Sequence, residues 1–281
     1  MSQQTERHQI TKMRVVYRMP GMDGVTIRRD VEYRATDAGA LTMDIYYPPA
    51  YEAGARTAAV VFVLGYSDVG FQRMLGCKQK EMESYISWAQ LAAASGLVAI
   101  TYETTDPATD VHALMDYLRK NDAELGIDAN CIGVWACSGN GPNALSVLMQ
   151  GAESGVKCAV LCYTITLDLD GATDVAEAAR QWGFANPCAG KSVADLPQEI
   201  PLFVVRAGRD QTPRLNETID RFIAAALRCN LAIRIENHRL APHSFDVMDD
   251  SETTREIIRE VLAFMRFHLS GANAEPGRPT A

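Results

Sequence analysis

The chain has 281 residues, of which 47% are hydrophobic and 22% are charged, so it can bury the core of a sizeable globular domain. Its formal net charge of −8, with no basic cluster, argues against binding to nucleic acid or to an anionic membrane surface. The N-terminal residues lack the apolar segment of a signal peptide, and no apolar run approaches the ~20 residues of a membrane span. These features predict a soluble, cytoplasmic protein.

The first half of the chain predicts strands that alternate with helices. The expected strands of this half, from their apolar patterns, are 25–35, 41–47, 58–64 and 97–102. The first two are expected to form a hairpin, and helices are expected from about Lys80 and from Asp110. Strands that alternate with helices indicate a parallel sheet with right-handed crossovers.

The second half continues this alternation but contains one long insert. Its expected strands are 131–136, 158–164, 202–206 and 231–236. Residues 165–200 have one helical piece and no strand, which favours a cap or lid. Trp182 and Phe184 in this insert are candidates for substrate binding, or they anchor the insert to the core. We expect one domain over 1–270 and a disordered tail over 271–281.

The stretch from 131 to 148 joins an apolar run to a helical pattern through a glycine-flanked serine. A serine on such a turn holds its hydroxyl clear of the sheet, beside the first N–H groups of the next helix. Ser138 is therefore the candidate nucleophile. Shifting the turn by one residue would select Cys137, but would place Trp135 where the turn needs a small residue. The alternative is a loop that merely connects a strand to a helix.

A serine nucleophile requires a base to accept its proton and a carboxylate to orient that base. Asp210 directly follows the strand after the insert, and His243 lies in the loop before the last helix. Both positions fall at the carboxyl edge of the parallel sheet, where the serine also lies. Asp168 and Asp170 are the alternative acids, and His238 is the alternative base.

Two features of these residues resemble the α/β-hydrolase family. The segment Ala-Cys-Ser-Gly-Asn around Ser138, followed by Gly141, resembles the family's Gly-x-Ser-x-Gly nucleophile elbow. The order Ser138, Asp210, His243 is the family's order of nucleophile, acid and base. The resemblance implies the α/β-hydrolase fold, with about eight strands in a mostly parallel sheet, helices on both faces and residues 165–200 as a small cap.

Shorter segments resemble one branch of that family. Gly-Arg-Asp at Asp210 and His-Ser-Phe-Asp at His243 resemble the Gly-x-Asp and His-Gly-Phe segments of dienelactone hydrolases and prolyl oligopeptidases. Ser244 stands in place of the usual glycine. The Gly-Tyr-Ser segment at Tyr66 resembles His-Gly-Tyr-Ser of acetyl xylan esterases, with Leu64 in place of their histidine.

The resemblance implies a serine esterase that acts on a small-molecule ester. In this family the oxyanion hole is formed by the N–H after the nucleophile and an N–H after the third strand, which here are those of Gly139 and Tyr66. Neither a metal nor an organic cofactor is implied, and a homodimer is compatible with the sequence. Hydrolysis of a lactone, thioester or peptide is an alternative, as is a non-catalytic ligand-binding protein with the same fold.

Overall fold

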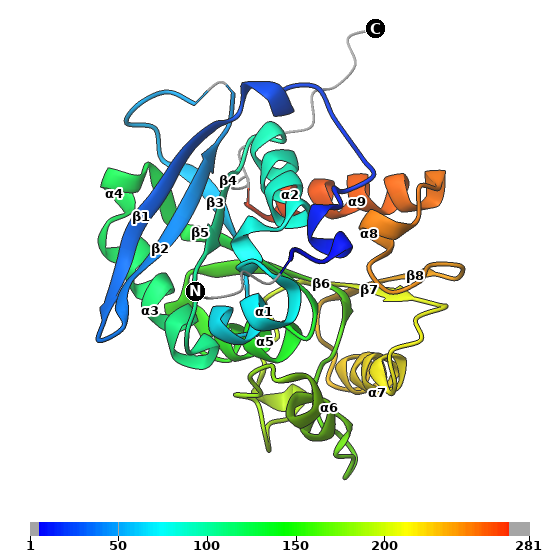
Figure 1. Ribbon diagram of the computed structural model, residues 1–281. Coiled ribbons are helices and arrows are strands. Elements are labelled where there is room, and N and C mark those ends of the chain that lie inside the picture. Colours follow the sequence, from blue (N-terminus) through cyan, green and yellow to red (C-terminus); the bar gives the residue numbers. More distant parts are fainter. Residues whose placement is uncertain (1–5, 50, 270–281) are drawn as a thin grey trace, which may run out of the picture.

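The computed structural model describes residues 6–49 and 51–269, which leaves the predicted tail, 271–281, outside the described part (Figure 1). Within that part, the strands form one eight-stranded sheet in the order β1-β2-β4-β3-β5-β6-β7-β8. The strands are β1 (Thr26–Thr36), β2 (Gly39–Tyr47), β3 (Thr57–Phe62), β4 (Val98–Tyr102), β5 (Ile127–Ser138), β6 (Val156–Thr164), β7 (Leu202–Ala207) and β8 (Ile233–His238). β2 pairs antiparallel with β1 and β4, and the other neighbouring strands pair parallel. The predicted sheet is confirmed.

Helices cover both faces of the sheet, as predicted. They are α1 (Asp68–Leu75), α2 (Glu83–Ala94), α3 (Pro107–Lys120), α4 (Asp122–Leu125), α5 (Gly141–Leu148), α6 (Asp174–Trp182), α7 (Leu215–Arg228), α8 (Phe245–Met248) and α9 (Glu252–Leu269). Helices α2 and α9 lie on one face, and α3, α5 and α7 lie on the other (Figure 1). No helix among the described residues is both long and apolar enough to cross a membrane.

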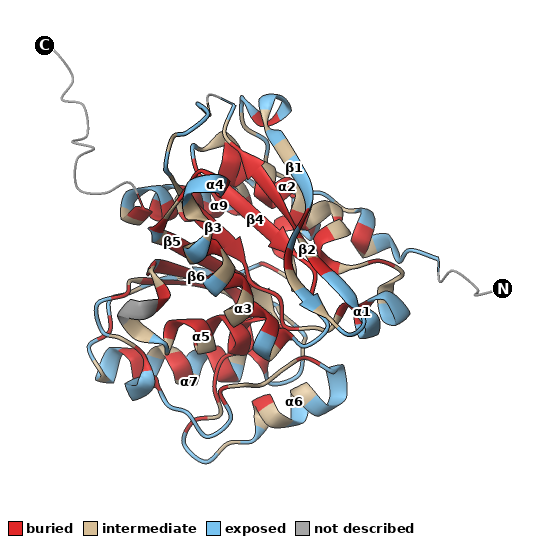
Figure 2. Ribbon diagram, turned by 90° about the vertical axis from the view of Figure 1, so that its left-hand side faces the viewer, coloured by how far each residue is buried: buried red, intermediate tan, exposed pale blue. Residues whose placement is uncertain are grey.

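The parallel strands form the centre of the core. Every residue of β4 is buried, and in β6 only Lys157 is exposed, because helices cover both faces of these strands (Figure 2). The edge strand β1 instead exposes about every other side chain to solvent. The buried strands therefore form a rigid frame whose carboxyl ends carry the loops with the candidate site residues.

Several element boundaries differ from those expected from the sequence. Helix α1 lies between the expected strand 58–64 and the helix expected from Lys80, where no helix was expected, because Gly70 and the polar residues of this short helix leave only Phe71 as a buried apolar anchor. The helix expected from Lys80 begins at Glu83, after a 3₁₀ turn at Gln79–Glu81. β5 begins before 131 because polar residues at its start interrupt the apolar pattern.

Candidate active site

Ser138 lies on a strained turn between β5 and α5. Its φ of 54° is in the left-handed region, which is unfavourable for a residue with a side chain. The turn is closed by the N–H of Asn140, which donates to the carbonyl of Cys137 at 3.0 Å. A Cβ at Gly141 would clash with the carbonyl oxygen of Ile165, so glycine is required at the start of α5. The small residue that the Gly-x-Ser-x-Gly pattern places at position 140 is therefore found at position 141 in this turn.

The three residues predicted as nucleophile, base and acid lie in one hydrogen-bonded row. Ser138 Oγ lies 3.0 Å from His243 Nε2, and His243 Nδ1 lies 2.7 Å from Asp210 Oδ2. Ser138 ends β5, Asp210 follows β7, and His243 lies between β8 and α8. The parallel sheet brings these loops together because each begins at the carboxyl end of its strand. The arrangement has the contacts that a nucleophile, its base and an orienting carboxylate require.

Asp210 provides a buried negative charge next to His243. Burial alone would raise the pKa of its carboxyl, but the hydrogen bond and the charge of His243 and the N–H of Thr212 hold that pKa below its ordinary value. The carboxylate is therefore ionised at neutral pH and accepts the Nδ1–H of His243. That leaves the lone pair of Nε2 directed toward Ser138.

The alternative acids and base have other partners. Asp168 accepts hydrogen bonds from two N–H groups in the first turn of α6, at 2.7 and 3.0 Å, and therefore caps this helix. Asp170 is exposed. His238 Nε2 lies 3.0 Å from both Thr254 Oγ1 and Asp249 Oδ2, which ties the end of β8 to the start of α9. In the described residues, no group of three His, Cys, Asp or Glu side chains could hold a metal ion.

Two backbone N–H groups lie free beside the turn. Among residues 6–49 and 51–269, neither the N–H of Gly139 nor that of Tyr66 donates to another protein group. The segments of these two residues are in close contact, since a Cβ at Gly65 would lie 2.6 Å from the carbonyl oxygen of Gly139. Two unpaired donors close to a nucleophile can stabilise an oxyanion.

Asn140 holds these two segments together, and the sequence analysis did not identify this role. The side chain is 1% exposed. Its Oδ1 accepts a hydrogen bond from the N–H of Gly65 at 2.7 Å, and its Nδ2 donates to the hydroxyl of Tyr85 at 2.7 Å. The unusual size of residue 140 in the elbow was the only signal of this role in the sequence.

We expect Asn140→Ala to lower the free energy of unfolding by about 1–3 kcal/mol, because it leaves the buried N–H of Gly65 without an acceptor. Urea denaturation followed by circular dichroism measures this change. Asn130→Ala is the matched control, since Asn130 is exposed. Equal stability of the two variants would contradict the role given to Asn140.

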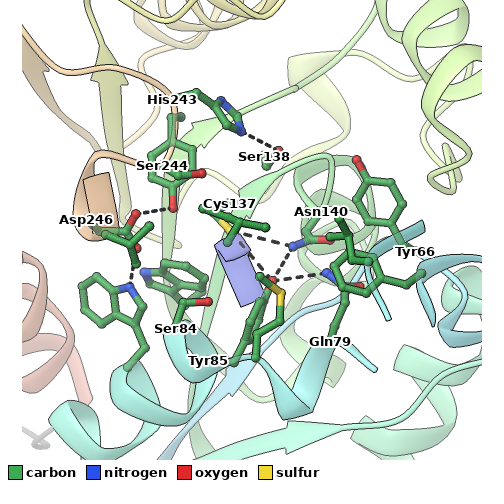
Figure 3. Close-up of a pocket in the computed structure, with 18 of the residues that line it drawn as sticks. Tyr66, Gln79, Ser84, Tyr85, Cys137, Ser138, Asn140, His243, Ser244 and Asp246 are labelled. Atoms are coloured by element: carbon green, nitrogen blue, oxygen red, sulfur yellow. Dashed lines mark hydrogen bonds between the residues drawn. The ribbon is translucent and has the colours of Figure 1, made fainter. Parts of the chain in front are cut away.

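Cys137, the alternative nucleophile, faces a different set of partners. Its sulfur lies 3.8 Å from the hydroxyl of Tyr85 and 3.9 Å from Nδ2 of Asn140 (Figure 3). Burial raises the pKa of the Cys137 thiol to about 12, so the thiol stays protonated at neutral pH. A protonated thiol is a poor nucleophile.

We expect Cys137 to react with iodoacetamide more slowly than Cys229 at about pH 8, because only the thiolate is reactive. Both residues have intermediate solvent exposure, so Cys229 is a suitable internal control. Peptide mass spectrometry over a time course measures the two rates. Equally fast modification of Cys137 would contradict its protonated state.

A cavity of about 250 Å³ opens beside Ser138 and His243. Six aromatic side chains among the described residues line it: Tyr66, Phe71, Tyr85, Trp88, Trp135 and Tyr163. Ile10, Met74, Leu75, Met82 and Val247 add to the lining, so aromatic and aliphatic side chains make up 11 of its 19 described residues and the cavity suits a largely apolar group.

A buried carboxyl group supports the wall below His243. Asp246 accepts hydrogen bonds from Trp88 Nε1 and from the hydroxyl of Tyr163, both at 2.7 Å (Figure 3). Burial raises the pKa of the Asp246 carboxyl despite these two donors. The ring of Tyr163 packs edge-on against that of His243, with centroids 5.2 Å apart. Tyr163 and Asp246 thus help to position the ring of His243, and the sequence analysis assigned neither of them this role.

Trp182 and Phe184 lie in different environments. Phe184 is 5% exposed and packs against the ring of Tyr66, with centroids 5.9 Å apart, while an isolated β-bridge joins the two backbones. Trp182 is 45% exposed and lines a separate groove with Arg209 and His243. Phe184 therefore anchors the insert 165–200 next to the free N–H of Tyr66. Trp182 lies outside the cavity, in the groove that it shares with His243.

No protein-family model matches the chain, and the comparison with curated proteins found no match. Among solved structures, it is similar to native esterase Est2 from the planctomycete Thermogutta terrifontis, with 21% identity over 91% of this chain and 97% of that chain and a TM-score of 0.63. The propionate-bound form has 21% identity over 92% and 98% of the two chains and a TM-score of 0.62. The form phosphoramylated by tabun has 20% identity over 89% and 97% and a TM-score of 0.62. The likeness spans nearly the whole of both chains, and it shows that this protein has the α/β-hydrolase fold.

Proposed function

We propose that the protein is a serine hydrolase that cleaves carboxylic esters through an acyl-enzyme. The observation that carries this proposal is the continuous row of hydrogen bonds from Ser138 Oγ through His243 to the Asp210 carboxylate. A strained serine, a base with its lone pair directed at that serine, and two free N–H donors are the elements of acyl transfer.

Each of these residues has a step in the proposed reaction. His243 Nε2 accepts the proton of Ser138 as Oγ attacks the ester carbonyl, and Asp210 stabilises the imidazolium that forms. The N–H groups of Gly139 and Tyr66 donate to the negatively charged oxygen of the tetrahedral intermediate. His243 then gives the proton to the departing alkoxide. A water molecule then attacks the acyl-enzyme, with His243 again as the base, and restores the hydroxyl of Ser138.

The cavity and the groove, which meet at His243, suggest where the acyl and alcohol halves of the ester lie. Ser138 and Tyr66 line the cavity, whereas His243 lines both the cavity and the groove at Trp182. The acyl carbon must bond to Ser138 with its oxygen at Tyr66, and the leaving oxygen must face His243. We therefore assign the acyl group to the cavity and the alcohol to the groove, where Trp182 would contact it.

The similar structures support the proposal. Esterase 2 of Thermogutta terrifontis is described with butyrate or propionate bound, and as phosphonylated by sarin. By analogy we propose ester cleavage for this chain, within the dienelactone hydrolase and prolyl oligopeptidase branch that its Gly-Arg-Asp and His-Ser-Phe segments resemble. We further propose a single cytoplasmic domain with residues 165–200 as its cap, which acts without a cofactor.

The test is hydrolysis of a panel of 4-nitrophenyl esters, from acetate to octanoate, with a mock purification from the host cells as control. We expect release of 4-nitrophenolate that scales with the concentration of the protein. Parallel assays with a lactone, a thioester and a peptide anilide rank the alternative substrates. A folded protein that hydrolyses none of the esters would contradict the proposed function.

A further inference from the structure

One side of the acyl cavity carries a buried polar group without a protein partner. Gln79 lies in the 3₁₀ turn after α1, lines the cavity and is 3% exposed. Its Nε2 donates to the hydroxyl of Tyr85 at 3.5 Å, and its backbone N–H donates to Asp68 Oδ1 at 3.1 Å. Its Oε1 accepts no hydrogen bond from any residue in the described part of the chain. A buried amide oxygen in this state favours a ligand that can donate a hydrogen bond.

The hydroxyl of Ser84 adds to this polarity, whereas that of Ser244 lies near His243 (Figure 3). Ser84 and Ser244 both line the cavity, and within residues 6–49 and 51–269 neither side chain bonds to another protein group. Figure 3 shows Gln79, Tyr85 and Ser84 on the side of the cavity away from Ser138 and His243. An acyl group that extends from Ser138 into the cavity therefore reaches this polar side with its far end.

The remaining wall restricts what that acyl group can be. Six aromatic side chains of the described residues line the cavity, and aromatic side chains pack favourably against another ring. The Oε1 of Gln79 is already buried and unpaired, and a purely hydrocarbon acyl group would not supply the hydrogen-bond donor that it lacks. An anionic end would lie in the same cavity as the buried Asp246 carboxyl, and a cationic end would lose its hydration without gaining a free counterion there.

We propose that the cavity selects an aromatic acyl group with a neutral hydroxyl at the end remote from the ester, and that this hydroxyl donates to Oε1 of Gln79. This inference rests on the proposed ester hydrolysis at Ser138. Gln79 is then a specificity residue, because it contacts the substrate far from the reacting carbonyl. The hydroxyl of Tyr85 accepts from both Gln79 Nε2 and Asn140 Nδ2, and Asn140 Oδ1 accepts from the N–H of Gly65. These hydrogen bonds connect the bound hydroxyl of the substrate to the loop of Gly65 and Tyr66.

The test compares two matched substrates, the 4-nitrophenyl esters of 3-(4-hydroxyphenyl)propanoate and 3-(4-methylphenyl)propanoate. They differ only in a hydroxyl against a methyl group of similar size. We expect kcat/KM of the wild type to be at least about tenfold higher for the hydroxyl ester, since that ester pairs the buried oxygen of Gln79. In Gln79→Met this ratio is expected to fall to about one, because the acceptor is lost and the chain length is kept. Gln72→Met, on the exposed side of α1, is the control and should keep the ratio of the wild type.

The outcomes separate this inference from the proposed function. Equal rates for the two esters in the wild type, or a preference for the methyl ester, would overturn the inference while ester hydrolysis stands. Turnover of 4-nitrophenyl acetate without turnover of either aromatic ester would also overturn it. A preference that survives in Gln79→Met would overturn the role of Gln79. If that variant does not fold, the wild-type ratio still decides whether the hydroxyl is recognised. Absence of turnover with all three esters would contradict the proposed function itself.

Discussion

Replacement of Ser138 by alanine is expected to lower kcat by about 10⁴-fold or more for every ester that the wild type cleaves. The variant lacks the oxygen that lies 3.0 Å from His243 Nε2, so no acyl-enzyme can form. The residual rate would come from substrate binding and from the two free N–H groups, those of Gly139 and Tyr66, beside the turn. Steady-state kinetics with a 4-nitrophenyl ester measures the loss, and circular dichroism verifies that the variant is folded.

Cys137→Ala is the matched control for this experiment, because it removes the nucleophilic atom of the residue next to Ser138. The thiol of Cys137 contacts Tyr85 and Asn140, and burial keeps it protonated. We therefore expect this substitution to change kcat by less than about 100-fold. The reverse pattern, with an active Ser138→Ala and an inactive Cys137→Ala, would show that the nucleophile is the thiol.

Asp210→Asn is expected to lower kcat by about 10⁴-fold at neutral pH. The amide has nearly the same shape as the carboxylate but carries no charge, and it can present its NH₂ group to Nδ1 of His243. The imidazole would then carry its proton on Nε2. The reaction instead requires a lone pair on Nε2 that faces Ser138. Initial rates at saturating ester measure this effect without interference from weaker binding.

Asp168→Asn is the control for the acid, because Asp168 is the alternative that the sequence leaves open. Its carboxylate caps α6, so its substitution should reduce stability and leave kcat within about tenfold of the wild type. A loss of rate in Asp168→Asn that equals or exceeds the loss in Asp210→Asn would contradict the assignment of the acid.

The sequence predicted the sheet and the common location of Ser138, Asp210 and His243 because both depend on local patterns. Buried parallel strands appear as continuous apolar runs, and the residues that directly follow such runs must lie at one edge of the sheet. Ser138 ends a strand, and Asp210 and His243 lie in loops that follow strands, so their common location could be predicted without knowledge of side-chain packing.

The surroundings of these residues could not be predicted in this way. Trp88 and Asp246 are hydrogen-bonded although 158 positions separate them, and no periodicity connects them. The contacts of Asn140 depend on the approach of the loop after β3, which only the folded chain defines. Gln79 lies between the expected strand 58–64 and the helix expected from Lys80, where the sequence predicts no element, so the free oxygen in its side chain could not be anticipated.

The central claim is that Ser138 is the nucleophile of an acyl-transfer reaction. Its most direct test is treatment of the protein with a fluorophosphonate, followed by peptide mass spectrometry and by assay of the remaining ester hydrolysis. We predict one phosphonyl group per chain, located on Ser138, with loss of activity in proportion to the fraction labelled. Loss of activity with the phosphonyl group on another residue, or full labelling of Ser138 without loss of ester hydrolysis, would contradict the account.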